Sequence, residues 1–411
     1  MLDTLYKSPL AASRLRTSPL GPWLDGFVAE LSRQGYPAGS CLSYVVLAAD
    51  LGRWMAGQQL KVTALCEPVI GDYVEQRGTQ HDRRRVAATH MLAHLRAGGV
   101  IPPRVLVEDR SRSAVICRRY EVHLREERGA APGTIEGYVA VVRSFLDRTF
   151  VGGPLDLDAL TADDVGGFLL ARADQLSPKR LDYMACALRS FLRHLFSRGE
   201  TSRDLSTAAL GAQIRHPARI PCHLKPEEVE RLIATADPAT RSGSRDRAIL
   251  LILARLGLRA GEVAALELND IRWRSAEVVV RSKGNVVDRL PLPSDVGKAL
   301  SQYLVEHRPR SDSRKVFLRL CAPIKELGGR SAISNVVRRR LRRAGLHPPR
   351  MGAHVLRHSL GTHMVCSGAT MAEISEVLRH HSPGSAEIYA RVDLEALRAL
   401  APPWPGTGGD R

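Results

Sequence analysis

The chain has 411 residues, 44% hydrophobic and 25% charged, so it can bury a substantial core, and this composition excludes large-scale disorder. Its 60 Lys and Arg residues against 43 Asp and Glu give a net charge of +17, which favours a polyanionic partner, nucleic acid ahead of an acidic membrane surface. The most apolar stretch, residues 248–258, is too short for a membrane span and contains Arg255, so we expect a buried helix there and no membrane partner.

The seven cysteines are scattered and show no Cys-x-x-Cys spacing. This argues against a zinc ribbon and against a disulfide framework, and it is typical of core residues in a reducing compartment. Residues 1–4 do not show the basic and apolar regions of a secretory signal. We therefore expect a cytoplasmic protein.

Two stretches of the N-terminal half resemble each other. An apolar run that begins at Tyr44 has a counterpart that begins at Tyr138, 94 positions later. Each run is followed by a short helical piece and a basic amphipathic segment: residues 69–74 and 83–95 in the first copy, 163–169 and 179–196 in the second. The pattern predicts a helical module of about ninety residues that is used twice. The alternative is a chance similarity between two amphipathic helical segments.

A linker separates these modules from the rest of the chain. Residues 203–221 lack hydrophobic periodicity and contain Pro217 and Pro221. We therefore divide the chain into an N-terminal helical module at 1–105, a second helical module at 110–203, a linker at 204–221, a C-terminal domain at 222–400 and a tail at 401–411.

The C-terminal domain combines helices with one β-hairpin. Pro226, followed by two acidic residues, is typical of a helix start, and a second helix is predicted at 246–256. Two β-branched runs, 277–281 and 286–290, flank a Gly-Asn turn and predict the hairpin. Further helices are predicted at 331–345, 354–367, 370–379 and 385–392. The expected fold is mainly α with a small antiparallel β-hairpin in this domain, an α+β class.

Five polar clusters of this domain are ordinary when taken singly. They are Gly257-Leu258-Arg259-Ala260-Gly261-Glu262, Lys283 in the hairpin turn, His354-Val355-Leu356-Arg357-His358, Leu378-Arg379-His380-His381 and Ile388-Tyr389. A helical Arg is usually solvated, and a Tyr on an amphipathic helix is usually half-buried core. Taken together and in this order, they resemble the catalytic domain of the tyrosine recombinase (phage integrase) family, whose pattern is Arg, a hairpin Lys, His-x-x-Arg, His or Trp, and Tyr.

The resemblance covers about residues 224–392, and residues 113–198 look like the core-binding domain of that family. It implies the catalytic set Arg259, Lys283, His354, Arg357, His380 and Tyr389. One departure is that the family usually has Leu-Gly-His where this chain has Leu378, Arg379 and His380.

The resemblance implies DNA cleavage by Tyr389, which would form a 3′-phosphotyrosyl bond and release a 5′-hydroxyl without metal, cofactor or ATP. Arginines suit the charge that develops on the phosphate, because guanidinium is planar and permanently charged. The roles expected for the remaining side chains are general acid for Lys283, proton acceptor or hydrogen-bond partner for His354, and phosphate contact for His380. Glu262 lies one helical turn after Arg259 and would orient Arg259 or His354, and a simple surface pair is the alternative.

Double-stranded DNA is the expected partner. The residues expected to bind its phosphates are Arg338, Arg339, Arg340, Arg342, Arg343, Lys179 and Arg180. By resemblance the protein would act as a homo-tetramer that exchanges strands between two duplexes, in integration, excision or transposition of a mobile element. The need for accessory proteins, the target sequence and the role of the first hundred residues stay open.

Three alternatives remain. A type IB topoisomerase would share the chemistry, and an inactive DNA-binding regulator would share only the DNA affinity. A metal site would use the histidines at 354, 358, 363, 380 and 381. A metal site is disfavoured because the His-Glu-x-x-His pattern is missing and Arg357 would repel a cation.

Overall fold

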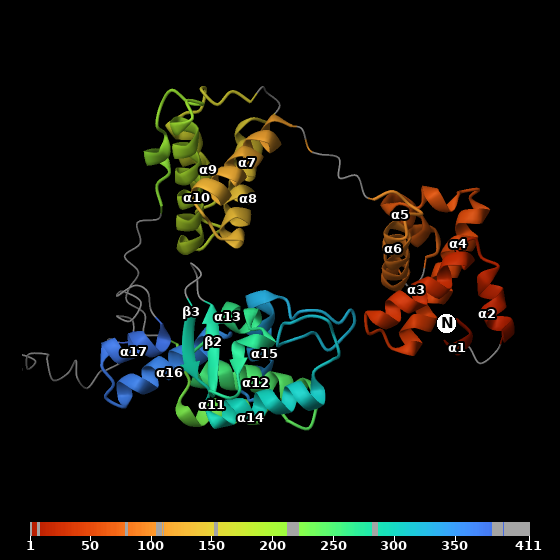
Figure 1. The fold of residues 1–411 in the computed structure, drawn as a ribbon. Helices are drawn as coiled ribbons and strands as arrows, with labels where there is room; N and C mark the ends of the chain where they lie inside the picture. Colours follow the sequence, from red (N-terminus) through yellow and green to blue (C-terminus); the bar gives the residue numbers. More distant parts are fainter. Residues whose placement is uncertain are drawn as a thin grey trace, which may run out of the picture. The chain divides into compact units, whose positions relative to one another are not determined.

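The computed structural model describes residues 2–5, 9–78, 81–103, 109, 111–151, 155–211, 222–281, 287–379 and 389. These residues form mainly helices, with one small antiparallel sheet in the C-terminal region (Figure 1). By contacts the chain divides into two compact units, one of Arg104–Pro217 and one of Met1–Pro103 with Ala218–Arg411. The expected α+β class, mainly helical with a small sheet, is confirmed.

The N-terminal segment is helical and has its own hydrophobic core. Its helices are α1 (Leu2–Leu5), α2 (Pro9–Arg16), α3 (Gly21–Arg33), α4 (Ala38–Gly57), the 3-10 turn η1 (Val62–Ala64), α5 (Glu67–Gln76) and α6 (His81–Ala97). Buried side chains of α3, α4, α5 and α6 make up the core, with Phe27, Leu51, Tyr73 and Met91 among its enclosed members. The amphipathic pattern of these helices therefore directs one apolar face of each inward.

The middle segment forms a second helical core. Its elements are α7 (Arg112–Val122), the π-helical turn η2 (His123–Glu127), α8 (Pro132–Thr149), α9 (Ala162–Leu170), α10 (Pro178–Ser197) and the 3-10 turn η3 (Ser206–Ala208). A capping box starts α9, in which the Thr161 hydroxyl accepts from the Asp164 backbone N at 3.3 Å and Asp164 accepts from the Thr161 backbone N at 2.9 Å. Phe145, Leu188 and Phe191 are fully buried between the helices.

The two segments share the order of helices expected from the sequence similarity. Helix α8 begins at 132 and α4 at 38, a separation of 94, and α9 ends at 170 and α5 at 76, again 94. In both segments a long helix, a short helix and a further long helix follow one another. The duplication of one module, like the domain boundaries, stays a prediction.

The C-terminal region carries the sheet. Its elements are α11 (Pro226–Ala234), α12 (Arg241–Arg255), α13 (Ala260–Ala265), the 3-10 turn η4 (Leu268–Asp270), β1 (Ile271–Arg272), β2 (Glu277–Arg281), β3 (Val287–Pro291), α14 (Ser294–Gln302), the π-helical turn η5 (Tyr303–His307), α15 (Gly329–Arg343), α16 (His354–Cys366) and α17 (Met371–Leu378). The strands lie in the order β1-β2-β3, and Val279 pairs with Arg289. Strand β2 has the predicted bounds, and β3 is described from 287 to 291 where 286–290 was predicted. Strand β1 was not predicted, because two residues are too few for a periodic signal.

Helix α12 is the centre of the C-terminal core and packs against α11, α14, α15 and α16 (Figure 1). Its residues 248–254 are all buried, as expected for a helix that is apolar on every side. The helix begins at Arg241, five residues before the predicted start, with Thr240 as its N-cap. The Thr240 hydroxyl accepts from the Gly243 backbone N at 3.0 Å. The first turns were missed because their polar residues show no apolar period. In the described ranges no helix is both long and apolar enough to cross a membrane.

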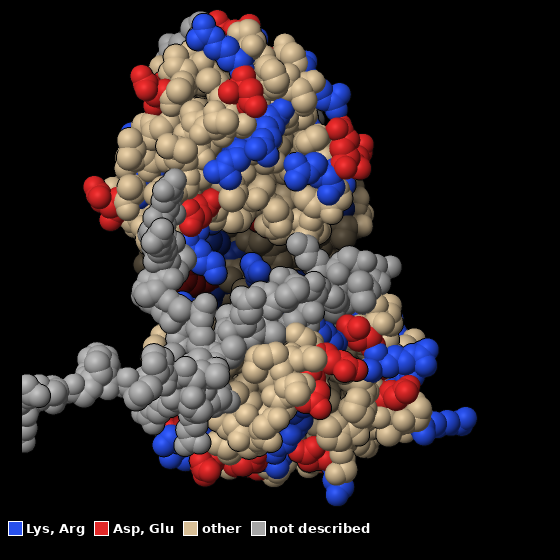
Figure 2. All heavy atoms as spheres, turned by 90° about the vertical axis from the view of Figure 1, so that its left-hand side faces the viewer, with Lys and Arg blue, Asp and Glu red and all other residues tan. Residues whose placement is uncertain are grey.

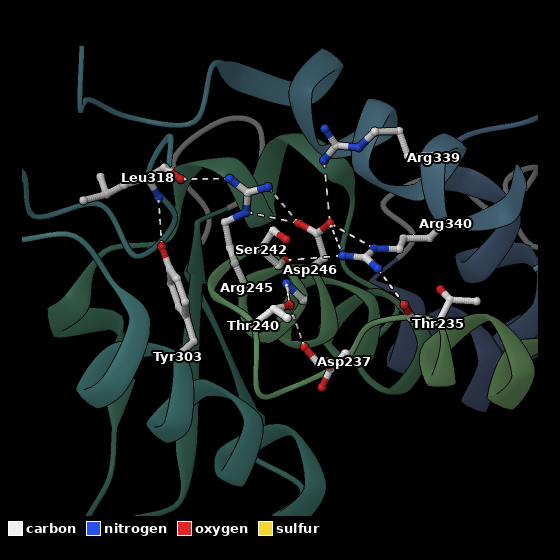
Figure 3. Close-up of polar contacts among 11 residues, drawn as sticks. Thr235, Asp237, Thr240, Ser242, Arg245, Asp246, Tyr303, Leu318, Arg339 and Arg340 are labelled. Atoms are coloured by element: carbon white, nitrogen blue, oxygen red, sulfur yellow. Dashed lines mark hydrogen bonds and ion pairs between the residues drawn. The ribbon is translucent and has the colours of Figure 1, made fainter. Parts of the chain in front are cut away.

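A buried carboxylate at the start of α12 joins two arginines, and we call Arg245, Asp246 and Arg340 the Asp246 cluster (Figure 3). Asp246 is 2% exposed. One of its oxygens accepts from Arg245 at 3.1 and 2.8 Å, and the other accepts from Arg340 at 3.0 and 2.8 Å. Arg340 also donates to the Thr235 carbonyl at 2.6 Å.

This geometry corrects one expected DNA contact. Arg340 is 3% exposed and its guanidinium is bound within the protein, so it cannot reach a DNA phosphate. The dense run of basic residues had predicted a phosphate contact for Arg340 together with its neighbours on α15. The residue instead belongs to the inward stripe of α15, together with Ile333, Val337 and Leu341, which are also buried.

Candidate active site

A tight turn between α12 and α13 places Arg259. Gly257 has φ +58, and a Cβ there would lie 2.7 Å from the Leu378 side chain and 3.0 Å from that of Leu360. Glycine is therefore required both for the left-handed backbone and for the close approach of α16 and α17. The chain leaves this turn with Arg259 as the N-cap residue of α13.

Glu262 holds Arg259 from within α13. One carboxylate oxygen accepts from the Arg259 backbone N and the other from its Nη1, both at 2.8 Å. The Glu262 residue is only 8% exposed, so the alternative of a surface pair is wrong. Burial alone would raise the pKa of Glu262, but the Arg259 backbone NH and the Arg379 and Arg259 guanidinium groups outweigh it and hold the pKa below its usual value.

Arg379 completes a second cluster, and sequence reasoning gave it no role. It follows α17 in the left-handed conformation, with φ 51 and ψ 58. Its Nη2 donates to Glu262 at 2.7 Å, and its carbonyl oxygen lies 3.3 Å from Nη2 of Arg259. We call Arg259, Glu262 and Arg379 the Glu262 cluster.

Arg357 lies on α16 and ties the ends of two other helices together. Its Nη1 donates to the carbonyl of Gly257, after α12, and its Nη2 donates to the carbonyl of Leu378, the last residue of α17. The residue is 5% exposed. Burial and the like charge of Arg259 lower the pKa of Arg357 to about 10, so the group stays charged at neutral pH.

Tyr389 packs against α16 and is fully buried. A Cβ at Gly361 would lie 2.6 Å from two carbons of its ring, so α16 leaves room for this ring only because residue 361 is glycine. Burial raises the pKa of the Tyr389 hydroxyl, against the opposing charges of Arg357 and Arg259. The hydroxyl is therefore protonated at neutral pH and needs a proton acceptor to become a nucleophile.

His358 is the acceptor next to that hydroxyl. Its Nδ1 lies 3.1 Å from the Tyr389 hydroxyl oxygen. Burial, together with its neighbours His354 and Arg357, lowers the pKa of His358 to about 4, so the ring is neutral at pH 7 and accepts this bond when Nε2 carries its proton. The sequence analysis assigned the role of proton acceptor or hydrogen-bond partner to His354 and no catalytic role to His358. His354 is the exposed first residue of α16, with its ring 6.3 Å from that of His358.

The structure thus brings Arg259, Glu262, His354, Arg357 and Tyr389 to the junction of α12–α13, α16 and the end of α17. Lys283 and His380 lie outside the described residues, as does the predicted helix at 385–392 apart from Tyr389. At this junction the guanidinium groups of Arg259, Arg357 and Arg379 outnumber the carboxylate of Glu262, and the net positive charge suits a bound phosphate. Among the described His, Cys, Asp and Glu side chains, no group of three or more is arranged to hold a metal ion.

The other expected DNA contacts are solvent-exposed. They are Arg338, Arg339, Arg342 and Arg343 on α15, and Lys179 and Arg180 in the first turn of α10. Arg339 lies at the rim of the Asp246 cluster, 3.6 Å from the Asp246 carboxylate, with 57% of its side chain exposed. On the face drawn in Figure 2, Lys and Arg side chains are interspersed with Asp and Glu side chains. These residues are accessible, and their contact with DNA stays a prediction.

Comparison with known proteins gives two family matches. The model of the phage integrase family matches residues 223–395, and the model of the phage integrase N-terminal SAM-like domain matches residues 117–199. Together they span the middle segment and the C-terminal region, which contains the site described above.

Similar proteins point the same way. The chain is 39% identical over 399 residues to a Sinorhizobium fredii (strain NBRC 101917 / NGR234) protein provisionally named integrase/recombinase y4rA, covering 96% of this chain and 97% of that protein. It is 30% identical over 285 residues to tyrosine recombinase XerC of Pelobacter propionicus (strain DSM 2379 / NBRC 103807 / OttBd1), covering 68% of this chain and 91% of that one.

A solved structure shows the same fold. XerH site-specific recombinase, in a post-cleavage complex with a palindromic difH substrate, superposes with a TM-score of 0.55 and 19% identity, covering 69% of this chain and 83% of that chain. The chain belongs to the phage integrase family of tyrosine recombinases.

Proposed function

We propose that this protein is a site-specific DNA recombinase that cleaves and rejoins DNA through a 3′-phosphotyrosyl intermediate at Tyr389. It exchanges strands between two duplexes and serves the integration, excision or transposition of a mobile element. The observation that carries the proposal is the meeting of Tyr389, its neutral partner His358 and three guanidinium groups at one junction of helices.

The arginines stabilise the charge of the reacting phosphate. Cleavage concentrates negative charge on the non-bridging oxygens, and preorganised donors are most effective there. Arg259 presents the more accessible guanidinium, because its side chain is 36% exposed while Glu262 fixes its orientation. Arg357 is enclosed and held by two carbonyls, so it supplies a fixed positive charge behind the site.

In the nucleophilic step one proton is transferred, one bond to phosphorus forms and one bond to phosphorus breaks. The Tyr389 oxygen forms the new bond to phosphorus while the bond to the 5′-oxygen breaks. The tyrosine proton passes to the neutral His358, whose Nδ1 lies 3.1 Å from the hydroxyl oxygen, and His354 is a further hydrogen-bond partner. By family resemblance Lys283 protonates the leaving 5′-oxygen and His380 contacts the phosphate. The sequence of bonds needs no metal, cofactor or ATP, because the phosphodiester energy is kept in the phosphotyrosyl bond.

Double-stranded DNA is the proposed partner, and a homo-tetramer in the cytoplasm is the proposed working assembly. The segments 110–203 and 222–400 are the proposed core-binding and catalytic domains, which together grip the duplex. Exposed side chains at the start of α10 and along α15 support phosphate contacts from both. Binding of this kind weakens steeply as the salt concentration rises.

The test uses DNA drawn from the flanks of the gene, nicked near the cleavage point so that the released fragment diffuses away. Denaturing gels in EDTA compare the wild-type protein with Tyr389→Phe. We expect a covalent protein–DNA band with the wild type alone. Tight binding with no covalent band would indicate an inactive regulator. Relaxation of supercoiled plasmid without a defined site would indicate a topoisomerase, and a band that EDTA removes would indicate a metal mechanism.

A further inference from the structure

Arg379 occupies a backbone position that disfavours it. Its φ of 51 and ψ of 58 lie in the left-handed region, where glycine is unstrained and other residues pay a conformational cost. Members of the family usually have glycine at this point of the sequence. The backbone strain alone assigns no function, since Gln59 and Ala276 also have a positive φ, so the contacts of the Arg379 side chain decide its role.

The burial of the Arg379 side chain gives the same indication. The residue is 7% exposed, and its Nη2 donates to Glu262 at 2.7 Å. Its Nε is 3.7 Å from the Asp288 carboxylate, beyond hydrogen-bond distance. Within the described part of the chain, Nε and Nη1 of Arg379 have no hydrogen-bond partner. Arg340 in the Asp246 cluster, by contrast, donates from Nε, Nη1 and Nη2.

Arg379 reaches Arg259 by two routes. Its own carbonyl oxygen lies 3.3 Å from Nη2 of Arg259. Its guanidinium binds the Glu262 oxygen that also receives the Arg259 backbone N, while the other oxygen receives Nη1 of Arg259. Three of the contacts that define the direction of Arg259 therefore depend on where Arg379 and Glu262 lie.

We propose that Arg379 is a positioning residue that fixes Arg259 for the DNA phosphate, through the ionised carboxylate of Glu262 and through its own carbonyl. The inference rests on the proposed function in so far as Arg259 is assigned to the phosphate. The coupling between Arg379 and Glu262 is a property of the free protein and is measured without any reaction.

The charges around Glu262 explain why the side chain of Arg379 is needed. Arg259 faces Glu262 from its own helix end, Arg379 from the end of α17 and Arg357 from α16, while Asp288 of β3 lies behind Arg379. Burial favours the neutral form of Glu262, and the positive neighbours restore the charged form. Without Arg379 one of the charges that lower the pKa of Glu262 is lost, and the effect of burial raises that pKa. Glu262 then takes up a proton at a higher pH and releases Arg259 there.

The first experiment follows the titration of the Glu262 carboxyl by 13C NMR in the full chain without DNA, with Glu262→Gln identifying the signal. In Arg379→Gly we expect the Glu262 pKa to rise by about 1 pH unit or more, and in Arg379→Lys to stay near the wild-type value, because lysine keeps the charge. Ala276→Gly is the matched control. Ala276 also has a positive φ, of 50, but carries no charge, so this variant removes a similar strain without removing a guanidinium and should leave the Glu262 pKa unchanged.

The second experiment measures single-turnover cleavage of the nicked DNA as a function of pH. Arg379→Gly should slow cleavage by about 10- to 100-fold at neutral pH, as loss of a supporting contact does, without weakening DNA binding equally. The acid limb of its pH profile should move to higher pH. In a Glu262→Gln background the same substitution should have a much smaller effect, because both changes break one chain of contacts.

Separate outcomes overturn the separate claims. An unchanged Glu262 titration in a folded Arg379→Gly protein contradicts the positioning role, whatever the activity. Multiplicative effects in the double variant contradict the route through Glu262 and indicate that Arg379 acts elsewhere, such as on the DNA itself. A wild-type protein that never forms the covalent band, but whose Glu262 responds to Arg379 as expected, contradicts the proposed function and leaves the coupling standing.

Discussion

The Asp246 cluster and the Glu262 cluster have the same composition, one buried carboxylate between two arginines, and they differ in how fully their donors are used. In the Asp246 cluster Nε and Nη2 of Arg245 bind the carboxylate and Nη1 binds the Leu318 carbonyl at 3.2 Å (Figure 3). Arg340 is similarly bound to Asp246 and to backbone carbonyls. In the Glu262 cluster Arg259 keeps a partly exposed guanidinium, and Arg379 keeps buried donors that no described residue accepts.

The number of donors that have an acceptor separates two uses of an arginine–carboxylate cluster. A carboxylate whose partners are saturated by internal acceptors holds elements together, here α12 and α15, and offers nothing to a ligand. The Glu262 carboxylate instead holds Arg259 with 36% of its side chain exposed, where a ligand can reach the guanidinium. Burial does not separate the two arginines, because Arg340 and Arg379 are both buried, whereas the number of donors that have an acceptor does.

The largest effect is expected from breaking the structural cluster. Asp246→Asn leaves two buried guanidinium groups without their counter-charge, so we expect the free energy of unfolding to fall by about 3–5 kcal/mol, measured by urea denaturation. Glu230→Gln is the control, since Glu230 pairs with Arg255 at 2.7 Å on the surface with 58% of its side chain exposed, and this change should cost less than about 1 kcal/mol. Equal losses in the two variants would contradict the structural role.

The second effect concerns rate rather than stability. Arg259→Ala removes the accessible guanidinium of the Glu262 cluster, and we expect cleavage of the nicked substrate to slow by about 10²- to 10³-fold, measured in single turnover. The free energy of unfolding should change by less than about 1 kcal/mol, because part of this side chain is already in solvent. A variant that unfolds more readily yet cleaves normally would reverse the assignment of the two clusters.

The third effect depends on pH. Glu262 accepts charged hydrogen bonds from both arginines, so Glu262→Gln should lower the free energy of unfolding by about 1.5–3 kcal/mol at pH 7. The folded-state pKa of Glu262 is below its ordinary value, so its contribution is complete above the unfolded value and is lost as the pH falls through the folded value. Denaturation at pH 7 and pH 4 should show the wild-type advantage shrinking in acid. A constant advantage would mean that the carboxylate is not ionised in the fold.

The smallest effect lies at the rim of the Asp246 cluster. Arg339 is largely exposed and 3.6 Å from Asp246, so Arg339→Ala should change the free energy of unfolding by about 0–1 kcal/mol. If Arg339 contacts a DNA phosphate, the slope of log affinity against log salt should fall by about 1 in the same variant. An unchanged slope would remove Arg339 from the DNA contacts and leave it as a solvated residue.

Much of the site follows from the sequence because its chemistry is local. The spacing of Arg259 and Glu262 predicts contact within one helical turn, and the order of Arg259, Arg357 and Tyr389 carries the family resemblance. The spacing of Ile333, Val337 and Leu341 also contained a signal for Arg340, which shares their inward stripe on α15. That signal was outweighed by the charge of the run, because a buried arginine is rare unless a partner such as Asp246 is known.

The remaining features depend on tertiary contacts that spacing does not encode. The role of Arg379 follows from a left-handed backbone and from a carboxylate 117 positions away. His358 adjoins Tyr389 because α16 carries glycine at 361 and lets the ring approach. Neither fact has a sequence pattern of its own, since each depends on which helix ends meet.

The glycine at 361 also bears on where the reactive oxygen lies. Because no methyl group projects from α16 at this point, the Tyr389 ring lies against the helix and its hydroxyl oxygen is 3.1 Å from Nδ1 of His358. A side chain at 361 would displace the ring and separate this oxygen from the imidazole. A missing side chain on one helix therefore sets the position of a reactive atom that belongs to another segment of the chain.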